Sequence, residues 1–262
     1  MTGRMQDKTV IVTGAARGMG RAIASRLAAE GARVTLADLD EAGAHEAAQE
    51  IRSQGNAALA VRVDVSQRAP VREMVARTVT EFGSVDVIFN NAGFNRPMHL
   101  LDVTEENWRS IMDVNALGVL LGTQEAAKQM ITQGGGGKII NTTSIAGRQG
   151  YPSFTPYCAS KFAVIAITQA TARGLAEHNI TANAFAPGVV DTPLWERLDK
   201  ELMDIGDAAE PGQAMADFSA GILRGRPATT ADIEGTAVFL ASSDSDYMTG
   251  QVLMIDGGMV LV

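Results

Sequence analysis

Short apolar, β-branched runs alternate along the chain with longer stretches in which apolar positions recur at helical spacing. This alternation predicts strand–helix–strand units built around a parallel sheet. The expected fold class is therefore α/β, with a Rossmann-type doubly wound sheet of about seven strands flanked by helices. The predicted strands are Thr9 to Thr13, Arg33 to Ala37, Ala57 to Val63, Val85 to Asn90, Lys138 to Thr143, Ile180 to Ala186 and Val252 to Ile255.

The helical stretches lie between these strands, and the first three of them end at a glycine. Gly31, Gly55 and Gly83 occupy those positions, where glycine favours a helix C-cap. No internal repeat or linker-like tract interrupts the 262 residues, so we expect one domain spanning residues 1–262. The predicted helices are Gly18 to Glu30, Asp40 to Gln54, Ser66 to Phe82, Thr104 to Gln133, Ser153 to Glu177 and Thr230 to Ser242.

Composition narrows the classes of function. One cysteine excludes an internal disulfide, and three dispersed histidines indicate no metal site. A net charge of −8 opposes binding to nucleic acid or to anionic membranes. No apolar run is long enough to span a membrane and the first residues are too polar for a signal peptide, so we expect a soluble, cytoplasmic protein.

A glycine-rich turn joins the first predicted strand to the first predicted helix. Gly14 would allow the tight turn, Gly18 would let the backbone approach a pyrophosphate, and Gly20 would let helix and strand pack closely. The helix N-terminus adds partial positive charge, so the turn predicts a dinucleotide site that also includes Arg17 and Met19. The alternative is a glycine turn required only for packing.

Asp38, at the end of the second strand, is the candidate that selects the cofactor. A carboxylate there can accept hydrogen bonds from the ribose hydroxyls of the adenosine and repel a 2′-phosphate, which favours NAD over NADP. Arg17 is a contrary signal, because a cation in the glycine loop could face that phosphate; it could equally point to solvent. A solvated acid at a strand end is the alternative reading of Asp38.

Other candidate cofactor contacts follow the strand ends. Asp64 could hold the adenine edge or serve only as a turn residue ahead of Ser66. Asn90 to Gly93 ends the fourth strand at the edge where ligands bind in doubly wound sheets, although it could be only an Asx-rich turn. The further candidates beside these residues are Leu39, Val65, Asn91, Ala92 and Gly93.

Tyr157 and Lys161 are four residues apart in a helical stretch, which places both side chains on one face. Lowering a phenol pKa from about 10 toward neutrality requires about 4 kcal/mol. One ammonium about 4 Å away supplies an energy of that order at an effective dielectric constant near 20. Tyr157 is thus a candidate general acid or base.

Ser144 and Asn115 support this hypothesis. Ser144 follows the fifth strand, and its hydroxyl could hydrogen-bond a substrate oxygen. Asn115 is a poor helix former inside Thr104 to Gln133, so it indicates a helix irregularity of the kind that holds a water. The alternatives are a serine that caps a loop and an asparagine packed against a strand.

Over essentially its whole length the sequence resembles the short-chain dehydrogenase/reductase family. The matching residues occur in family order: Gly14, Gly18, Gly20, Asn90 to Gly93, Asn115, Ser144, Tyr157, Lys161, Pro187, Gly188 and Asp256 to Gly258.

The resemblance implies a role for each matched position. Ser144 would orient the substrate oxygen, Tyr157 would exchange the proton, and Asn115 would anchor a water relay. Lys161 would depress the tyrosine pKa and hold the nicotinamide ribose. Pro187, Gly188, Val190 and Thr192 would flank the nicotinamide. A homotetramer is implied as well, with Thr104 to Gln133 and Ser153 to Glu177 as interface candidates.

We expect the substrate to be selected by Asp191 to Arg226, which mixes apolar and charged residues and could close as a lid or simply pack on the domain. The segments Ser245 to Gln251 and Ile255 to Met259 resemble acetoin (2,3-butanediol) dehydrogenases, and Ala186 to Asp191 with Trp195 resembles polyol (sorbitol-type) dehydrogenases. These resemblances favour a polyol or vicinal diol and its hydroxyketone. The alternatives are a 3-oxoacyl thioester or other ketone reductase and a non-catalytic NAD-binding regulatory protein.

Overall fold

The computed structural model describes residues 3–261 and contains one parallel sheet in the order β3-β2-β1-β4-β5-β6-β7. The predicted fold class is confirmed. The chain adds β2 and β3 on one side of β1 and then β4 to β7 on the other side. Doubly wound sheets bind their ligands at this point, where the strand order reverses. The strands are β1 (Thr9–Thr13), β2 (Arg33–Asp38), β3 (Ala58–Arg62), β4 (Val87–Asn90), β5 (Gly137–Thr142), β6 (Ile180–Pro187) and β7 (Val252–Ile255).

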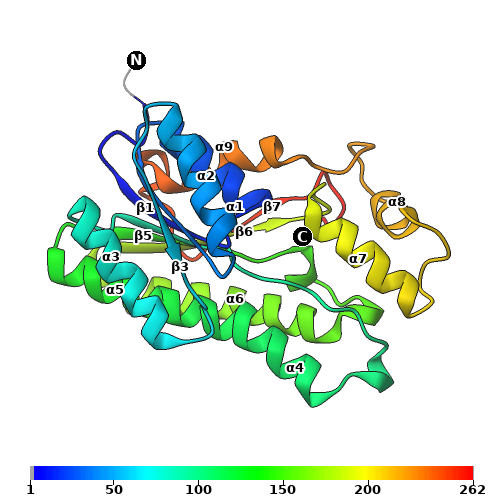
Figure 1. The fold of residues 1–262 in the computed structure, drawn as a ribbon. Coiled ribbons are helices and arrows are strands. Elements are labelled where there is room, and N and C mark those ends of the chain that lie inside the picture. The colour runs from blue at the N-terminus through cyan, green and yellow to red at the C-terminus, as the bar shows by residue number, and fades with distance from the viewer. Residues whose placement is uncertain (1–2, 262) are drawn as a thin grey trace.

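Helices cover both faces of the sheet (Figure 1). One layer consists of α1 (Gly18–Ala29), α2 (Glu41–Ser53) and α9 (Thr230–Ala241). The other consists of α3 (Arg68–Phe82), α4 (Glu105–Met112), α5 (Gly118–Gln133) and α6 (Thr155–Gly174). A separate apolar cluster packs each layer onto the sheet, so the central strands are buried on both sides.

The long predicted helix Thr104 to Gln133 is interrupted. Between α4 and α5 the backbone makes a π-helical turn over Asp113–Leu117, and Asn115 lies inside that turn, fully buried. The helix irregularity predicted from Asn115 is therefore confirmed. Such turns occur often at functional sites.

The irregular segment of the sequence holds two further helices, α7 (Pro193–Asp204) and α8 (Gln213–Ser219). They form a lobe beside the carboxyl ends of the strands (Figure 1). Leu198, Leu202 and Ala214 of the lobe pack against Phe154 and Cys158 near the start of α6. These helices were not predicted, because α7 is rich in charged residues and α8 is short.

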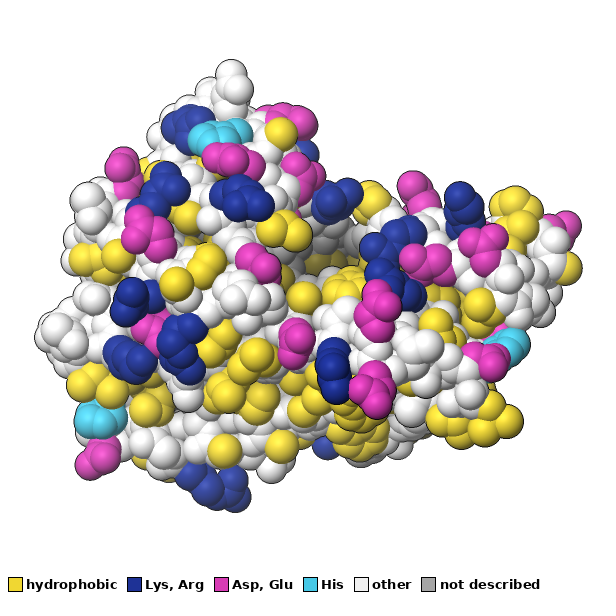
Figure 2. All heavy atoms as spheres, turned by 60° about the horizontal axis from the view of Figure 1, so that its bottom comes forward, with side chains coloured by type: hydrophobic (Ala, Val, Ile, Leu, Met, Phe, Trp, Pro, Cys, Tyr) yellow, Lys and Arg dark blue, Asp and Glu magenta, His cyan; other side chains and the backbone are white. Residues whose placement is uncertain are grey.

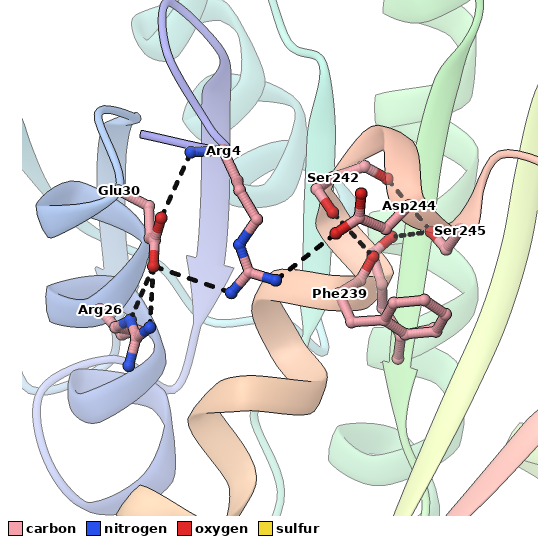
Figure 3. A network of polar contacts seen from close by, with 8 residues as sticks. Arg4, Arg26, Glu30, Phe239, Ser242, Asp244 and Ser245 are labelled. Carbon is pink, nitrogen blue, oxygen red and sulfur yellow. Dashed lines mark hydrogen bonds and ion pairs between the residues drawn. The ribbon is translucent and has the colours of Figure 1, made fainter. Parts of the chain in front are cut away.

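Ion pairs fasten the N-terminal segment far from this lobe (Figure 3). The Arg4 backbone N–H donates to Glu30 at 3.2 Å, and the Arg4 guanidinium lies 3.4 Å from Asp244. Arg26 also donates to Glu30 at 2.8 Å, and this hydrogen bond is the main reason that the pKa of Glu30 is lowered. Exposed pairs of this kind contribute little stability, so their effect is to position the chain end. Among residues 3–261, no helix combines the length and apolar character needed to cross a membrane.

Candidate active site

Two adjoining cavities open at the carboxyl edge of the sheet. The larger has a volume of about 340 Å³, and the smaller has a volume of about 110 Å³. In Figure 2 the molecule is hollowed between its main body and the lobe. Six residues line both cavities: Met19, Asn91, Gly93, Phe94, Thr192 and Leu194. A ligand in the larger cavity would therefore reach the smaller one.

The glycine turn forms one wall of the larger cavity, the dinucleotide cavity. Gly14 has a φ of +66°, and a Cβ on it would lie 2.8 Å from the Ala92 Cα. A Cβ on Gly20 would collide with the carbonyl oxygen of Gly14. The turn and the close packing predicted from these glycines are both present, and the N-terminus of α1 begins at this wall.

Asp38 is tied to the same turn. Its Oδ2 accepts a hydrogen bond from the Ala16 backbone N–H at 2.9 Å, and its Oδ1 accepts one from Asp40 N–H at 3.0 Å. Arg17 points largely to solvent, and its guanidinium lies 3.6 Å from the Asp40 carboxylate. The carboxylate of Asp38 is thus fixed at the cavity wall, while the nearby cation pairs with a different acid.

Asp64 has the turn role considered from the sequence, and its position leaves the adenine-binding role a prediction. It lines the dinucleotide cavity, and its Oδ1 accepts hydrogen bonds from the Ser66 N–H at 3.0 Å and the Ser66 hydroxyl at 2.6 Å. The candidate cofactor residues on this cavity are Gly14, Arg17, Gly18, Met19, Gly20, Asp38, Leu39, Asp64, Val65, Asn91, Ala92, Gly93 and Thr192. Pro187, Gly188 and Val190 line the smaller cavity instead.

Ser144, Tyr157 and Lys161 meet at the smaller cavity, the catalytic cavity. Lys161 Nζ lies 5.5 Å from the centroid of the Tyr157 ring and donates to the Thr142 carbonyl oxygen at 2.9 Å. The Ser144 side chain lines the cavity together with Tyr157. Its Oγ also accepts from the Ala146 N–H at 3.1 Å, so the capping role considered from the sequence is present too. Folding brings together three groups that are spread over 18 positions of the sequence.

Burial dominates the electrostatics of this trio. Loss of water contact raises the pKa of Tyr157 to about 12, although the Ser144 side chain partly opposes this. Burial also lowers the pKa of Lys161 to about 8. The charge of Lys161 must therefore act against a substantial desolvation of the phenolate.

Asn115 lines neither cavity, but its side chain holds the segment at Phe94, which lines both of them. Its Oδ1 accepts from the Phe94 N–H at 3.0 Å, and its Nδ2 donates to the Phe94 carbonyl at 2.8 Å and to Ser160 Oγ at 3.2 Å. Asn90 also turns into the protein, where its amide donates to Asn141 at 2.9 Å. The π-helical turn thus fixes the segment that follows β4.

Part of the wall of the catalytic cavity was not identified from the sequence. Aromatic rings from three segments pack against one another, with centroids 5.5 Å apart for Trp195 and Phe218 and 5.4 Å apart for Phe154 and Phe218. The only sequence signal for Phe94 and Asn95 was that they directly follow the Asn90 to Gly93 run, which was itself predicted to lie at the ligand-binding edge. The cavity-lining residues that were not predicted include Phe94, Asn95, Tyr151 and Phe154, whereas Leu198 and Phe218 lie in the segment 191–226 that was expected to select the substrate.

Comparisons with known proteins agree with this geometry. A family model described as enoyl-(acyl carrier protein) reductase matches residues 14–260. The chain is 43% identical over 254 residues to a diacetyl reductase, (S)-acetoin forming, of Staphylococcus epidermidis, covering 97% of this chain and 99% of that one. It is 42% identical over 255 residues to a galactitol 2-dehydrogenase of Agrobacterium fabrum, covering 97% and 98%.

A solved structure is similar over the same extent. A short-chain type dehydrogenase/reductase from Mycobacterium marinum superposes with a TM-score of 0.91 at 35% identity, covering 98% of this chain and 97% of that one. The chain belongs to the short-chain dehydrogenase/reductase family, whose members bind nicotinamide cofactors. The resemblance inferred from the sequence motifs is confirmed.

Proposed function

We propose that this protein is an NAD(H)-dependent dehydrogenase that interconverts a vicinal diol or polyol with its hydroxyketone. The observation that carries the proposal is the meeting of Ser144, Tyr157 and Lys161 at a cavity that adjoins the dinucleotide cavity. A hydroxyl held there would have a proton acceptor on one side and the reactive end of a cofactor within reach.

Each of the three side chains has a separate task. The nicotinamide, when bound, accepts or supplies the hydride. Ser144 donates a hydrogen bond to the substrate oxygen and orients it. Tyr157 takes the hydroxyl proton in oxidation and returns it in reduction. With a pKa of about 8, Lys161 is mostly charged at pH 7, and its charge favours the ionised form of Tyr157.

Asp38 supports the choice of NAD. Its carboxylate is fixed by Ala16 and Asp40, and a 2′-phosphate placed against it would bring two negative charges together. Arg17, the cation that could offset this repulsion, pairs with Asp40.

The substrate class rests on the relatives, one of which is named for diacetyl and acetoin and another for galactitol. Each name points to a carbonyl or hydroxyl carbon beside a second oxygenated carbon. An assembled catalytic trio disfavours the non-catalytic alternative, a regulatory NAD-binding protein. A 3-oxoacyl thioester reductase would use the same trio and is separated by its substrate alone.

Two structural proposals accompany the activity. Residues 191–226 act as the substrate lid, since α7 and α8 cover the aromatic side of the catalytic cavity. The protein assembles as a homotetramer through α5, the π-helical turn before it and α6, where Leu117, Leu120 and Phe162 leave between 36% and 47% of their surface exposed. The cytoplasmic location expected from the sequence stays a prediction.

An NADH absorbance assay tests the proposed function. The panel should contain acetoin, diacetyl, 2,3-butanediol, galactitol, sorbitol, 2-butanone and a 3-oxoacyl thioester, each with NAD(H) and NADP(H). We expect the highest kcat/KM for a substrate with two adjacent oxygenated carbons and NAD(H). Turnover only of the thioester, or of nothing in the panel, would overturn the proposal.

A further inference from the structure

Asn95 has a buried polar atom without a partner at the wall of the catalytic cavity. The residue follows β4, is only 3% exposed and lines the same cavity as Ser144 and Tyr157. Its Oδ1 has no hydrogen-bond partner among the described residues. Buried amide oxygens in native proteins are nearly always hydrogen-bonded, so this atom calls for a partner from outside the chain.

The backbone that carries Asn95 is held from both sides. Asn115 pairs with the N–H and the carbonyl of Phe94 at 3.0 and 2.8 Å. From the lobe, Arg197 donates to the Asn95 carbonyl at 2.7 Å, and its guanidinium lies 5.8 Å from the Phe94 ring centroid. The side-chain amide is therefore presented on a fixed segment, which lowers the entropic cost of binding a ligand group.

This amide lies close to the reacting centre. A Cβ on Gly93 would be 3.5 Å from Lys161 Nζ, and Asn95 is two residues further along, within about 7 Å of extended chain. The catalytic cavity has a volume of only about 110 Å³, so a ligand that reaches Tyr157 also approaches Asn95.

Most other polar side chains of the wall, apart from the catalytic trio, already have partners, and among the described residues of the wall only Asn95 has a side-chain polar atom that is both buried and unpaired. Thr143 donates to the Lys161 carbonyl at 2.8 Å, and the Tyr151 hydroxyl accepts from Gln149 at 2.7 Å. The remaining three with hydrogen-bond partners are Asn91, Thr142 and Thr192. A second hydroxyl of a substrate in this cavity would thus meet a buried acceptor that lacks a partner, and the hydrogen bond between them would offset the cost of burying both groups.

We infer that the Asn95 side-chain amide binds the second oxygen of the substrate, the one on the carbon next to the reacting carbon. This inference rests on the proposed function and deepens it. An amide can bind the second oxygen whether it is a hydroxyl or a ketone, because Oδ1 accepts from a hydroxyl and Nδ2 donates to a hydroxyl or a ketone oxygen. Asn95 is then the group that makes the enzyme prefer diols and hydroxyketones over simple alcohols and ketones.

The test compares two substrates that differ only in the second oxygen. Asn95→Leu keeps the shape of the side chain and removes its polar atoms. It should lower kcat/KM for acetoin by about 10-fold to 100-fold and change kcat/KM for 2-butanone by less than about threefold. NADH binding, followed by fluorescence, should be unchanged. If Asn95→Leu does not fold, Asn95→Ala should show the same selective loss.

Asn107 provides the matched control. It is 1% exposed and also has an unpaired side-chain oxygen, but it lies in α4 and does not line the catalytic cavity. Asn107→Leu should leave the acetoin to 2-butanone ratio unchanged.

The outcomes separate the inference from the proposed function. A wild-type enzyme that prefers acetoin, with an Asn95→Leu variant of unchanged ratio, overturns the role of Asn95 alone. Equal losses for both substrates also overturn it, because they indicate a structural role or an amide paired with water. A wild-type enzyme inactive on every adjacent-oxygen substrate overturns the proposed function and the inference together.

Discussion

Lys161 is one helical turn from Tyr157, and the Lys161 Nζ lies 5.5 Å from the centroid of the Tyr157 ring. The same nitrogen donates a hydrogen bond to the Thr142 carbonyl oxygen at 2.9 Å. Lys161 is buried and Tyr157 is partly buried, and this loss of solvation raises the pKa of Tyr157 and lowers the pKa of Lys161. A proton lost from either group leaves the same total charge, so the state that has lost one proton includes the form with an ionised phenol.

The pKa values of Tyr157 and Lys161 predict opposite pH profiles for alcohol oxidation and ketone reduction. The pair should lose its first proton near the Lys161 pKa of about 8. For alcohol oxidation, which needs a proton acceptor, kcat/KM should rise about tenfold per pH unit below about pH 8 and then level off. For ketone reduction it should be level at low pH and fall above about pH 8. Profiles that are flat in both directions would contradict the assignment.

Lys161→Met should abolish most activity and yet stabilise the fold. Burial lowers the pKa of Lys161 from 10.5 to about 8, so the folded state bears the cost of a buried charge at neutral pH. Removing that charge should raise the free energy of unfolding by roughly 1 to 3 kcal/mol, after allowance for the lost hydrogen bond to Thr142.

The pH dependence of the stability gained by Lys161→Met tests whether the gain comes from removing the buried charge. Because the folded pKa is depressed, the penalty is complete below about pH 8 and disappears as pH rises through 10.5, where Lys161 is neutral in both states. Denaturant unfolding at pH 7 and at pH 10.5 should show a gain that shrinks toward zero. A gain of equal size at both pH values would point to packing instead of charge.

Tyr157→Phe should nearly eliminate turnover while NADH still binds. The substitution removes the hydroxyl that exchanges the proton and keeps the ring, which packs 6.4 Å from the Phe154 centroid. We expect kcat to fall by a factor of about 100 to 10,000. Steady-state kinetics and NADH fluorescence titration measure the two effects, and substantial residual activity would refute the role of Tyr157.

Asp38→Asn should weaken the preference for NAD over NADP. An asparagine oxygen can still accept from the Ala16 N–H, so the glycine turn keeps its 2.9 Å contact while the negative charge is lost. The ratio of kcat/KM for NAD to that for NADP should fall by about tenfold or more. Glu41→Gln is the matched control, since Glu41 is a nearby acid in the first turn of α2 that neither lines the dinucleotide cavity nor pairs with Arg17. An unchanged ratio in Asp38→Asn would count against the choice of NAD.

Local physics explains why most of the fold could be predicted from the sequence. The strand predictions lie within a residue or two of β1 to β7, because buried parallel strands are short apolar runs that end at turn residues. Gly31, Gly55 and Gly83 all have positive φ values, as helix ends of this type require. The candidate catalytic residues Ser144, Tyr157 and Lys161 were proposed because their order and spacing are those of a family motif, and the fold brings them to one cavity.

Only the tertiary structure decided which distant segments contact one another. The Arg197 side chain donates to the Asn95 carbonyl across 102 positions, and the lobe of α7 and α8 packs against Phe154. Neither contact leaves a periodic signal in the sequence. The unpaired oxygen of Asn95 is likewise visible only once its neighbours are in place. Hydrophobic periodicity and turn chemistry act over a few residues, and so they fix the elements; burial, the pKa shifts that follow from it and the shape of the cavity arise only when those elements pack.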